Sequence, residues 1–134
     1  MDITALQDTK NWRVLVVDDE PDNIAIMEAV LQLQNIEVAT ARSAKIAEGI
    51  LDDFHPNLIL LDIAMPDING YGFLEILRAR DDTANVPVIA VTANVVSNDK
   101  RKATKAGFDG YIAKPFEVFA LVPTIQRILG FQTS

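Results

Sequence analysis

The residues best suited to chemistry lie in the stretch VLVVDDEPDN (residues 14–23), where four apolar residues run directly into three acidic ones. Asp18, Asp19 and Glu20 are consecutive, so their carboxylates stand at the end of a segment that is typical of a buried strand. Two like charges about 4 Å apart repel each other by roughly 4 kcal/mol at an effective dielectric constant of about 20. A cluster of this kind needs a counter-ion, which indicates a binding site.

Three other polar residues end apolar segments in the same way. Asp62 follows LILL, Thr92 follows VIAV, and Lys114 follows YIA and precedes Pro115. If these segments are parallel strands of one sheet, their carboxyl ends meet at one edge, where α/β proteins place their ligands. We therefore expect carboxylates, a hydroxyl and an ammonium group to converge there.

The expected cluster is suited to a metal and to phosphoryl transfer. Asp18, Asp19 and Asp62 offer only hard, anionic oxygen ligands, which favour Mg²⁺, and Mn²⁺ would also fit. A carboxylate beside such a metal can itself accept a phosphoryl group. Lys114 and Thr92 would then neutralise and hydrogen-bond the added oxygens. The chain has no GxxxxGK[ST] motif, so a nucleotide-binding P-loop is not predicted.

The elements that position these residues alternate along the chain. Strands are predicted at residues 13–17, 36–40, 58–61, 86–91 and 111–113. Helices are predicted from Pro21, from the cap Ser43 to about residue 54, from the cap Asn69 to residue 77, at 100–106 and at 116–129. This alternation predicts an α/β fold with a doubly wound parallel sheet covered on both faces.

Composition sets the outer limits of function. The chain has 134 residues, a net charge of −7 and no cysteine, which suits one soluble domain without disulfides. The apolar runs are too short to span a bilayer, and MDITALQDTKNW does not resemble a secretory signal. We therefore expect a cytoplasmic protein without membrane contact. The acidic balance also argues against direct binding to nucleic acid.

Four segments, in order along the chain, resemble the signature blocks of bacterial response-regulator receiver domains: VVDDEPDN, LLDIAMPDINGYGFL, VIAVTA and AGFDGYIAKPF. The resemblance covers residues 13–129 and extends to the chemotaxis regulators. It implies a flavodoxin-like sheet of five strands in the order 2-1-3-4-5 with five helices. It also implies a signalling protein that catalyses only its own phosphorylation and dephosphorylation.

The resemblance implies which residue accepts the phosphoryl group and which residues bind the metal. Asp62 accepts a phosphoryl group from a phosphohistidine on a histidine kinase or a histidine phosphotransfer protein. Asp19 and Asp62 bind Mg²⁺ directly, and Asp18 binds it mostly through water. The backbone carbonyl of Ala64 provides a further metal ligand.

The resemblance also implies which residues respond to phosphorylation and which influence the rate of dephosphorylation. Thr92 and Lys114 contact the phosphoryl oxygens, and Tyr111 turns inward as Thr92 moves. The output surface, which binds a downstream protein or passes the phosphoryl group on, comprises residues 100–106, 111–113 and 116–129. Ala64 and Asn94 flank the path of the hydrolytic water. Because Ala64 cannot orient that water, slow to moderate self-dephosphorylation is predicted.

Several alternatives stay open at this point. Tyr111 could be an ordinary half-buried aromatic residue of a strand. Glu20 and Asp22 read as charges at a helix N-terminus, with Glu20 at the rim of the metal site. The basic run Lys100, Arg101, Lys102 and Lys105 could be a solvated face or a docking surface.

The expected domain division is a leader at residues 1–12, the receiver domain at 13–130 and a tail at 131–134. A stand-alone regulator is favoured, monomeric or dimerising on phosphorylation. The alternative is a receiver module excised from a hybrid histidine kinase or a larger regulator. A more remote rival is a Mg²⁺-dependent phosphatase of the haloacid-dehalogenase type. That class would have a second Asp two residues after the nucleophile, where this chain has Ala64.

Overall fold

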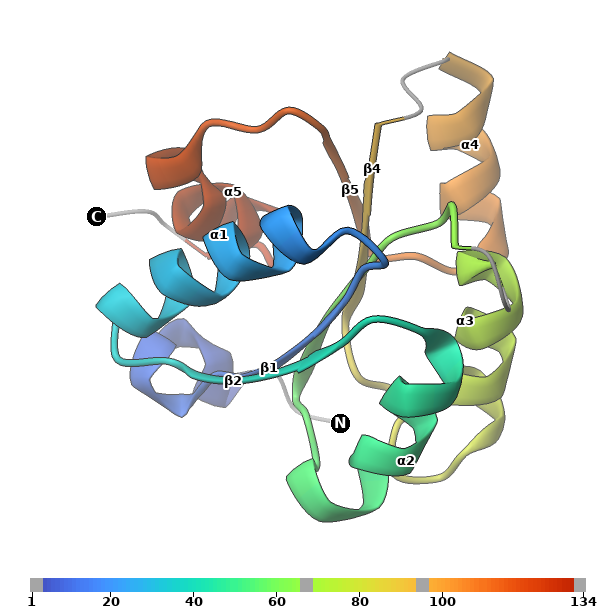
Figure 1. Ribbon diagram of the computed structural model, residues 1–134, viewed down its shortest axis with the longest axis horizontal. Helices are drawn as coiled ribbons and strands as arrows, with labels where there is room; N and C mark the ends of the chain where they lie inside the picture. Colours follow the sequence, from blue (N-terminus) through green and yellow to red (C-terminus); the bar gives the residue numbers. More distant parts are fainter. Residues whose placement is uncertain (1–3, 66–68, 94–96, 132–134) are drawn as a thin grey trace.

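The computed structural model describes residues 4–65, 69–93 and 97–131. Within them lies a parallel five-stranded sheet in the order β2-β1-β3-β4-β5 (Figure 1). Its strands are β1 (Arg13–Val17), β2 (Glu37–Ala41), β3 (Leu58–Leu61), β4 (Val88–Thr92) and β5 (Gly110–Ala113). The doubly wound topology and the strand order expected from the resemblance are confirmed.

The helices follow the strands as predicted, with the expected caps. They are α1 (Pro21–Leu33), α2 (Ala44–Phe54), α3 (Gly70–Ala79), α4 (Ser97–Ala106) and α5 (Leu121–Ile128). The Ser43 hydroxyl accepts a hydrogen bond from the Ile46 amide, and the Asn69 side chain accepts one from Gly72. Each cap satisfies an amide that has no partner inside its own helix. None of the described helices is long and apolar enough to cross a membrane.

The helices cover the two faces of the sheet unequally. α1 and α5 pack on one face, and α2, α3 and α4 pack on the other (Figure 1). Successive strand residues point to opposite faces, so Val14 and Val16 join the core under α1 and α5, whereas Leu15 and Val17 join the core under the other three helices. Both cores are continuous up to the carboxyl ends of the strands.

Several element boundaries differ from the prediction by one to three residues, and three differences have a clear local cause. Ile36 belongs to the turn that ends α1, because its amide donates to the Leu31 carbonyl, so β2 begins at Glu37. β4 begins at Val88 because Pro87 has no N–H to donate to the ladder. The helix predicted at 116–129 is a 3₁₀ turn, η3 (Val118–Ala120), followed by α5 from Leu121. Pro123 lies in the first turn of α5, where its missing N–H has no partner to lose.

The segment predicted as a leader contributes to the core. It forms two short 3₁₀ turns, η1 (Thr4–Gln7) and η2 (Thr9–Asn11). Leu6 and Trp12 are fully buried in the core under α1 and α5, and the Trp12 indole Nε1 donates to the Leu6 carbonyl at 2.7 Å. This segment closes the amino end of that core.

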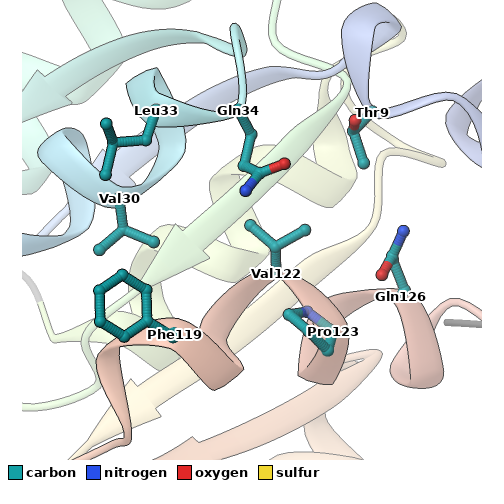
Figure 2. A pocket seen from close by; sticks show the side chains of 8 residues that line it. All are labelled: Thr9, Val30, Leu33, Gln34, Phe119, Val122, Pro123 and Gln126. Carbon is teal, nitrogen blue, oxygen red and sulfur yellow. The ribbon is translucent and has the colours of Figure 1, made fainter. Parts of the chain in front are cut away.

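An uncharged groove separates α1 from α5 and has a volume of about 240 Å³. Figure 2 shows Val30 and Leu33 of α1 on one side and Phe119 and Val122 on the other, with Thr9 at one end. Two large apolar side chains on the rim of the groove are unusually exposed to solvent: Leu33 is 72% exposed and Phe119 is 77% exposed.

Candidate functional site

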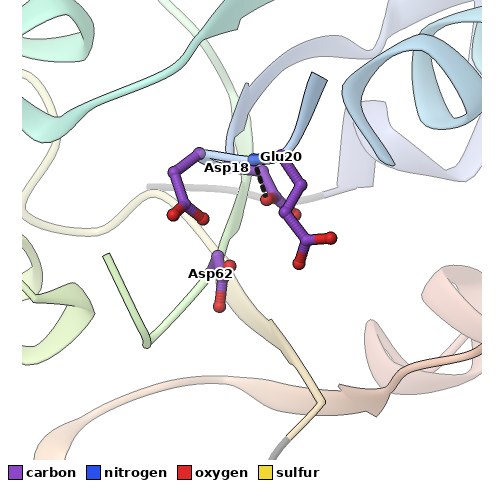
Figure 3. Close-up of side chains that lie close together, drawn as sticks. Asp18, Glu20 and Asp62 are labelled. Atoms are coloured by element: carbon purple, nitrogen blue, oxygen red, sulfur yellow. Dashed lines mark hydrogen bonds between the residues drawn. The ribbon is translucent and has the colours of Figure 1, made fainter. Parts of the chain in front are cut away.

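The carboxylates predicted at the strand ends do converge. Oxygen atoms of Asp18, Asp19, Glu20 and Asp62 lie within 4.8 Å of one another. Figure 3 shows the side chains of Asp18, Glu20 and Asp62 turned toward a common space. The sheet holds two of them directly, because the Asp18 amide donates to Ala41 and the Asp62 amide donates to Val17. The ladder thus continues one residue past β1 and β3 and places these two carboxylates side by side.

Lys114 inserts a positive charge into the cluster. Its Nζ lies 2.7 Å from Asp18 Oδ2, 3.3 Å from Asp62 Oδ2 and 3.7 Å from Glu20 Oε1. The side chains of Asp18, Asp62 and Lys114 are 1%, 5% and 8% exposed, whereas that of Glu20 is 60% exposed. One ammonium therefore faces two buried carboxylates, and the buried charge is not balanced.

Burial and charge shift the protonation of this pair. The pKa of Asp62 is raised from 3.8 to about 6, mainly by burial and to a smaller extent by the charge of Asp18. The Lys114 charge and the hydrogen bond from the Ala64 amide oppose that rise without cancelling it. Burial acts to lower the pKa of Lys114, but the hydrogen bond to Asp18 and the charges of Asp62 and Asp18 prevail, so its pKa is raised. Lys114 stays an ammonium, and Asp62 is the carboxyl that is costly to ionise.

A cavity of about 230 Å³ opens above the cluster. It is lined by Asp19, Glu20, Asp62, Ala64, Thr92, Ala93 and Lys114. Asp18 lies beneath it, fully buried, and accepts hydrogen bonds from Lys114 and from the Glu20 amide. The donor set is all oxygen and anionic, so the residues fit a hard divalent cation such as Mg²⁺.

Thr92 and Tyr111 lie on one face of the sheet. Thr92 is 1% exposed at the end of β4. Tyr111 is opposite Ala90 in the β4–β5 register, and since side chains alternate along a strand, Ala90, Thr92 and Tyr111 share a face. Tyr111 is half-buried against the core under α2, α3 and α4. The Lys114 amide donates to the Thr92 carbonyl at 2.9 Å, which ties the ends of β4 and β5 together.

Comparison with known proteins decides the family. The response regulator receiver domain family matches residues 14–126. The chain belongs to the response-regulator receiver family. Receiver domains are phospho-accepting signalling switches, and the comparisons give no support to the phosphatase alternative.

Individual relatives are similar over most of this receiver domain. The polar-differentiation response regulator DivK of Brucella ovis is 31% identical over 87% of this chain and 95% of its own length. The chemotaxis protein CheY4 of Vibrio cholerae superposes with a TM-score of 0.82 at 26% identity, over 87% of this chain and 98% of its own. The receiver domain of the sensor histidine kinase PA1611 of Pseudomonas aeruginosa, solved with magnesium coordinated in its active-site cleft, has a TM-score of 0.78 at 31% identity, over 89% and 98%.

Most of the predicted site residues of the receiver domain meet in one place. Thr92 and Lys114 line the same cavity as Asp19, Asp62 and Ala64, and the Lys114–Pro115 peptide bond is cis. Asn94 lies outside the described residues.

Sequence reasoning placed Glu20 only at the rim of the site. It does occupy the N-cap position of α1, and its carboxylate also belongs to the cluster. The available signal was its position directly after two aspartates, before the proline that starts the helix.

Proposed function

We propose that the chain is the phospho-accepting switch of a two-component system or phosphorelay, with Asp62 as the acceptor. The observation that carries the proposal is the buried Asp62 carboxylate at the base of a cavity, with Lys114 Nζ 3.3 Å from its Oδ2. Phosphoryl transfer from a partner's phosphohistidine forms a bond from an Asp62 oxygen to phosphorus. The phosphorus–nitrogen bond breaks, and its electron pair returns to the imidazole.

The surrounding residues prepare and hold that carboxylate. With a pKa of about 6, Asp62 is mostly ionised above pH 7 and more basic than an exposed aspartate. Its Oδ1 accepts a hydrogen bond from the Ala64 amide, which orients the carboxylate. Lys114 and Thr92 stabilise the charge that develops on the transferred oxygens. Asp18, Asp19, Asp62 and the Ala64 carbonyl would hold Mg²⁺, which would neutralise the carboxylates and bind a phosphoryl oxygen.

The test is phosphorylation by acetyl phosphate with and without Mg²⁺, read by intact-protein mass spectrometry. The wild type should gain one phosphoryl group only when Mg²⁺ is present, and Asp62→Ala should gain none. Asp53→Ala, which removes an exposed carboxylate from α2, is the matched control and should behave like the wild type. Modification that persists in Asp62→Ala would contradict the assignment.

The switch runs through Thr92 and Tyr111 to the surface formed by α4, β5 and α5. The shared face of Thr92 and Tyr111 and the half-buried position of Tyr111 support this route. Beryllofluoride with Mg²⁺ should shift the ring signals of Tyr111 in NMR spectra of the wild type. In Thr92→Ala the same treatment should leave them near their unphosphorylated positions. A downstream protein would bind this surface, or the phosphoryl group would pass onward to one.

The outer face of α1 is the docking surface that we assign to the histidine-bearing partner. α1 contains no Lys or Arg, and it exposes Ile26 (42%) and Leu33 (72%) although Met27 and Leu31 of the same helix are buried. The outer face also carries Asp22 and Gln32, but two large apolar side chains exposed on a helix without basic residues are typical of a binding surface. It begins directly after the acidic cluster and continues into the groove of Figure 2. A helical histidine kinase or phosphotransfer domain could pack on it with its histidine over the cavity.

Docking and chemistry can be separated with two matched substitutions. Ile26→Glu should reduce phosphotransfer from a phosphohistidine protein while leaving phosphorylation by acetyl phosphate unchanged. Ile46→Glu changes the same residue type at similar exposure (52%) on α2, across the sheet, and should affect neither reaction. An equal loss in both variants would argue against a specific surface on α1.

The lifetime of the phosphorylated state and the location complete the proposal. Ala64 lines the cavity without a polar side chain, so decay of the acyl phosphate should be slow to moderate. Ala64→Asn should accelerate it, and an unchanged decay rate would contradict this role.

A cytoplasmic, monomeric protein, or one that dimerises on phosphorylation, fits the same proposal.

A further inference from the structure

Gly70, the first residue of α3, lies against the backbone of the acceptor loop. A Cβ added at Gly70 would lie 2.6 Å from the Ile63 Cα and 2.8 Å from the Asp62 carbonyl oxygen. Both neighbours are backbone atoms and cannot rotate away as a side chain could. The Gly70 amide also donates to the Ile63 carbonyl at 2.8 Å. The start of α3 and the acceptor peptide are therefore in direct contact.

The need for glycine at this position is steric. Gly107 and Gly130 have positive φ values of 110° and 87°, so their backbone conformation explains them. Gly70 is not among the residues with positive φ, and the nearest atoms that a larger residue there would meet are those of the Asp62–Ile63 peptide. Gly49 of α2 is the opposite case, because an added Cβ would meet no atom within 4 Å.

The groups that Gly70 holds are those of the site. Asp62 and Ala64 flank the contacted residue Ile63, and both line the cavity. The Ala64 amide bonds to Asp62 Oδ1 at 3.0 Å. Asp18 and Asp19 follow β1 and would not move with this loop. A small displacement of the loop would therefore change the spacing between the two halves of the acidic cluster.

We propose that Gly70 is a positioning residue that lets α3 clamp the Asp62–Ala64 segment opposite Asp18 and Asp19 at the spacing a divalent cation requires. This inference rests on the proposed function of the site. Outer contacts that orient metal ligands typically change metal affinity by about 10- to 100-fold when they are lost, and we expect Gly70→Ala to have an effect in that range.

The experiment compares Gly70→Ala with Gly49→Ala, since both replace a helical glycine by alanine. Mg²⁺ affinity is measured by calorimetry on the whole chain, and the position of the Ala64 amide signal is measured by NMR before Mg²⁺ is added. Gly70→Ala should bind Mg²⁺ about 10- to 100-fold more weakly and should shift the Ala64 signal. Gly49→Ala should match the wild type in both measurements and melt at a higher temperature, because alanine favours the helix.

The fold is monitored through the buried Trp12, the only tryptophan, which lies in the opposite core from Gly70. If Gly70→Ala does not fold, the double variant Gly49→Ala/Gly70→Ala is compared with Gly49→Ala. A folded Gly70→Ala protein that binds Mg²⁺ as tightly as the wild type would overturn the inference even if it melts earlier. A wild type that neither binds Mg²⁺ nor is phosphorylated would instead overturn the proposed function.

Discussion

The two ends of the sheet carry their charges in opposite ways. Near the amino ends of the strands, arginines face carboxylates at the partly exposed surface: Arg13 with Glu37, Arg78 with Asp109, and Arg80 with Asp52 and Asp82. At the carboxyl end, buried Lys114 faces two buried carboxylates, with Asp19 and Glu20 close by. The ion pairs at the amino end are partly exposed, whereas at the carboxyl end one buried ammonium faces two buried carboxylates.

The difference separates charges that serve the fold from charges that serve the function. Exposed ion pairs cost little and contribute little. A buried carboxylate that lacks a full counter-charge destabilises the folded state. A protein that keeps such a cluster sacrifices stability for a site.

The largest effect is expected at Lys114. Lys114→Met removes the ammonium beside Asp62 and should slow phosphorylation by acetyl phosphate by about 100- to 1,000-fold, the range for losing one preorganised donor to a developing charge. The rate is followed by mass spectrometry at fixed Mg²⁺. Lys105→Met, on the exposed face of α4, should leave the rate unchanged. A loss of less than threefold in Lys114→Met would mean that this charge does not take part in the transfer.

Arg78 should show the reverse behaviour at the amino end. Its guanidinium donates to the carbonyls of Val86 and Gly107 and to Asp109, joining the loops before β4 and β5. Arg78→Met should lower the free energy of unfolding by about 2 to 3 kcal/mol, measured in urea, with phosphorylation of the folded protein intact. Arg42→Met, at an exposed position, is the control and should change stability little. Lost phosphorylation in folded Arg78→Met would break the division between the two ends.

The carboxyl end was the easier of the two to predict from sequence. Asp18, Asp62 and Thr92 each follow an apolar run, and in a parallel sheet that position alone brings them together. The order of the strands needed the family resemblance, because alternation of strands and helices does not say which strands are neighbours. The contacts of Arg78 could not be predicted in this way, because its partners lie in two loops and Asp109 is 31 residues away.

Gly70 and the start of α5 show why the remainder was missed. The clash at Gly70 depends on a tertiary contact with Ile63, which no local pattern encodes. The apolar spacing at residues 116–129 predicts a helix, yet the chain forms a 3₁₀ turn first. Glu20 lies at the exposed rim, as expected, and sequence alone did not show that its carboxylate would lie 3.7 Å from the Lys114 ammonium.

The ionised carboxylate of Asp62 at the carboxyl end should lower the stability of the folded protein. The pKa of Asp62 is about 6 in the folded protein and 3.8 without these contacts, so folding favours the protonated form. That stability is fully present below pH 3.8 and is lost as pH rises through about 6. One pKa unit corresponds to about 1.4 kcal/mol, so Asp62→Asn should stabilise the Mg²⁺-free protein by about 2 to 3 kcal/mol at pH 8.

The pH dependence separates this effect from a general change in packing. The gain in Asp62→Asn should shrink steadily between pH 7 and pH 4.5, as the wild-type carboxyl takes up its proton. Urea denaturation of both proteins across this range measures it. Asp109→Asn removes a carboxylate at the amino end and should destabilise instead, because it weakens the contact with Arg78. A gain in Asp62→Asn that does not depend on pH would exclude the ionisation of Asp62 as its cause.

The smallest effect is expected for the Arg13–Glu37 pair, whose side chains are 36% and 66% exposed. Glu37→Gln should change the free energy of unfolding by no more than about 0.5 kcal/mol. The change should become smaller above about 0.5 M salt, because the screening length decreases. Arg13 would keep its place, because its guanidinium also donates to the Phe54 carbonyl and lies 4.5 Å from the centre of the Phe54 ring. A salt-independent loss of about 2 kcal/mol or more would show that charge at this end is as consequential as at the other, and burial would then not be what distinguishes them.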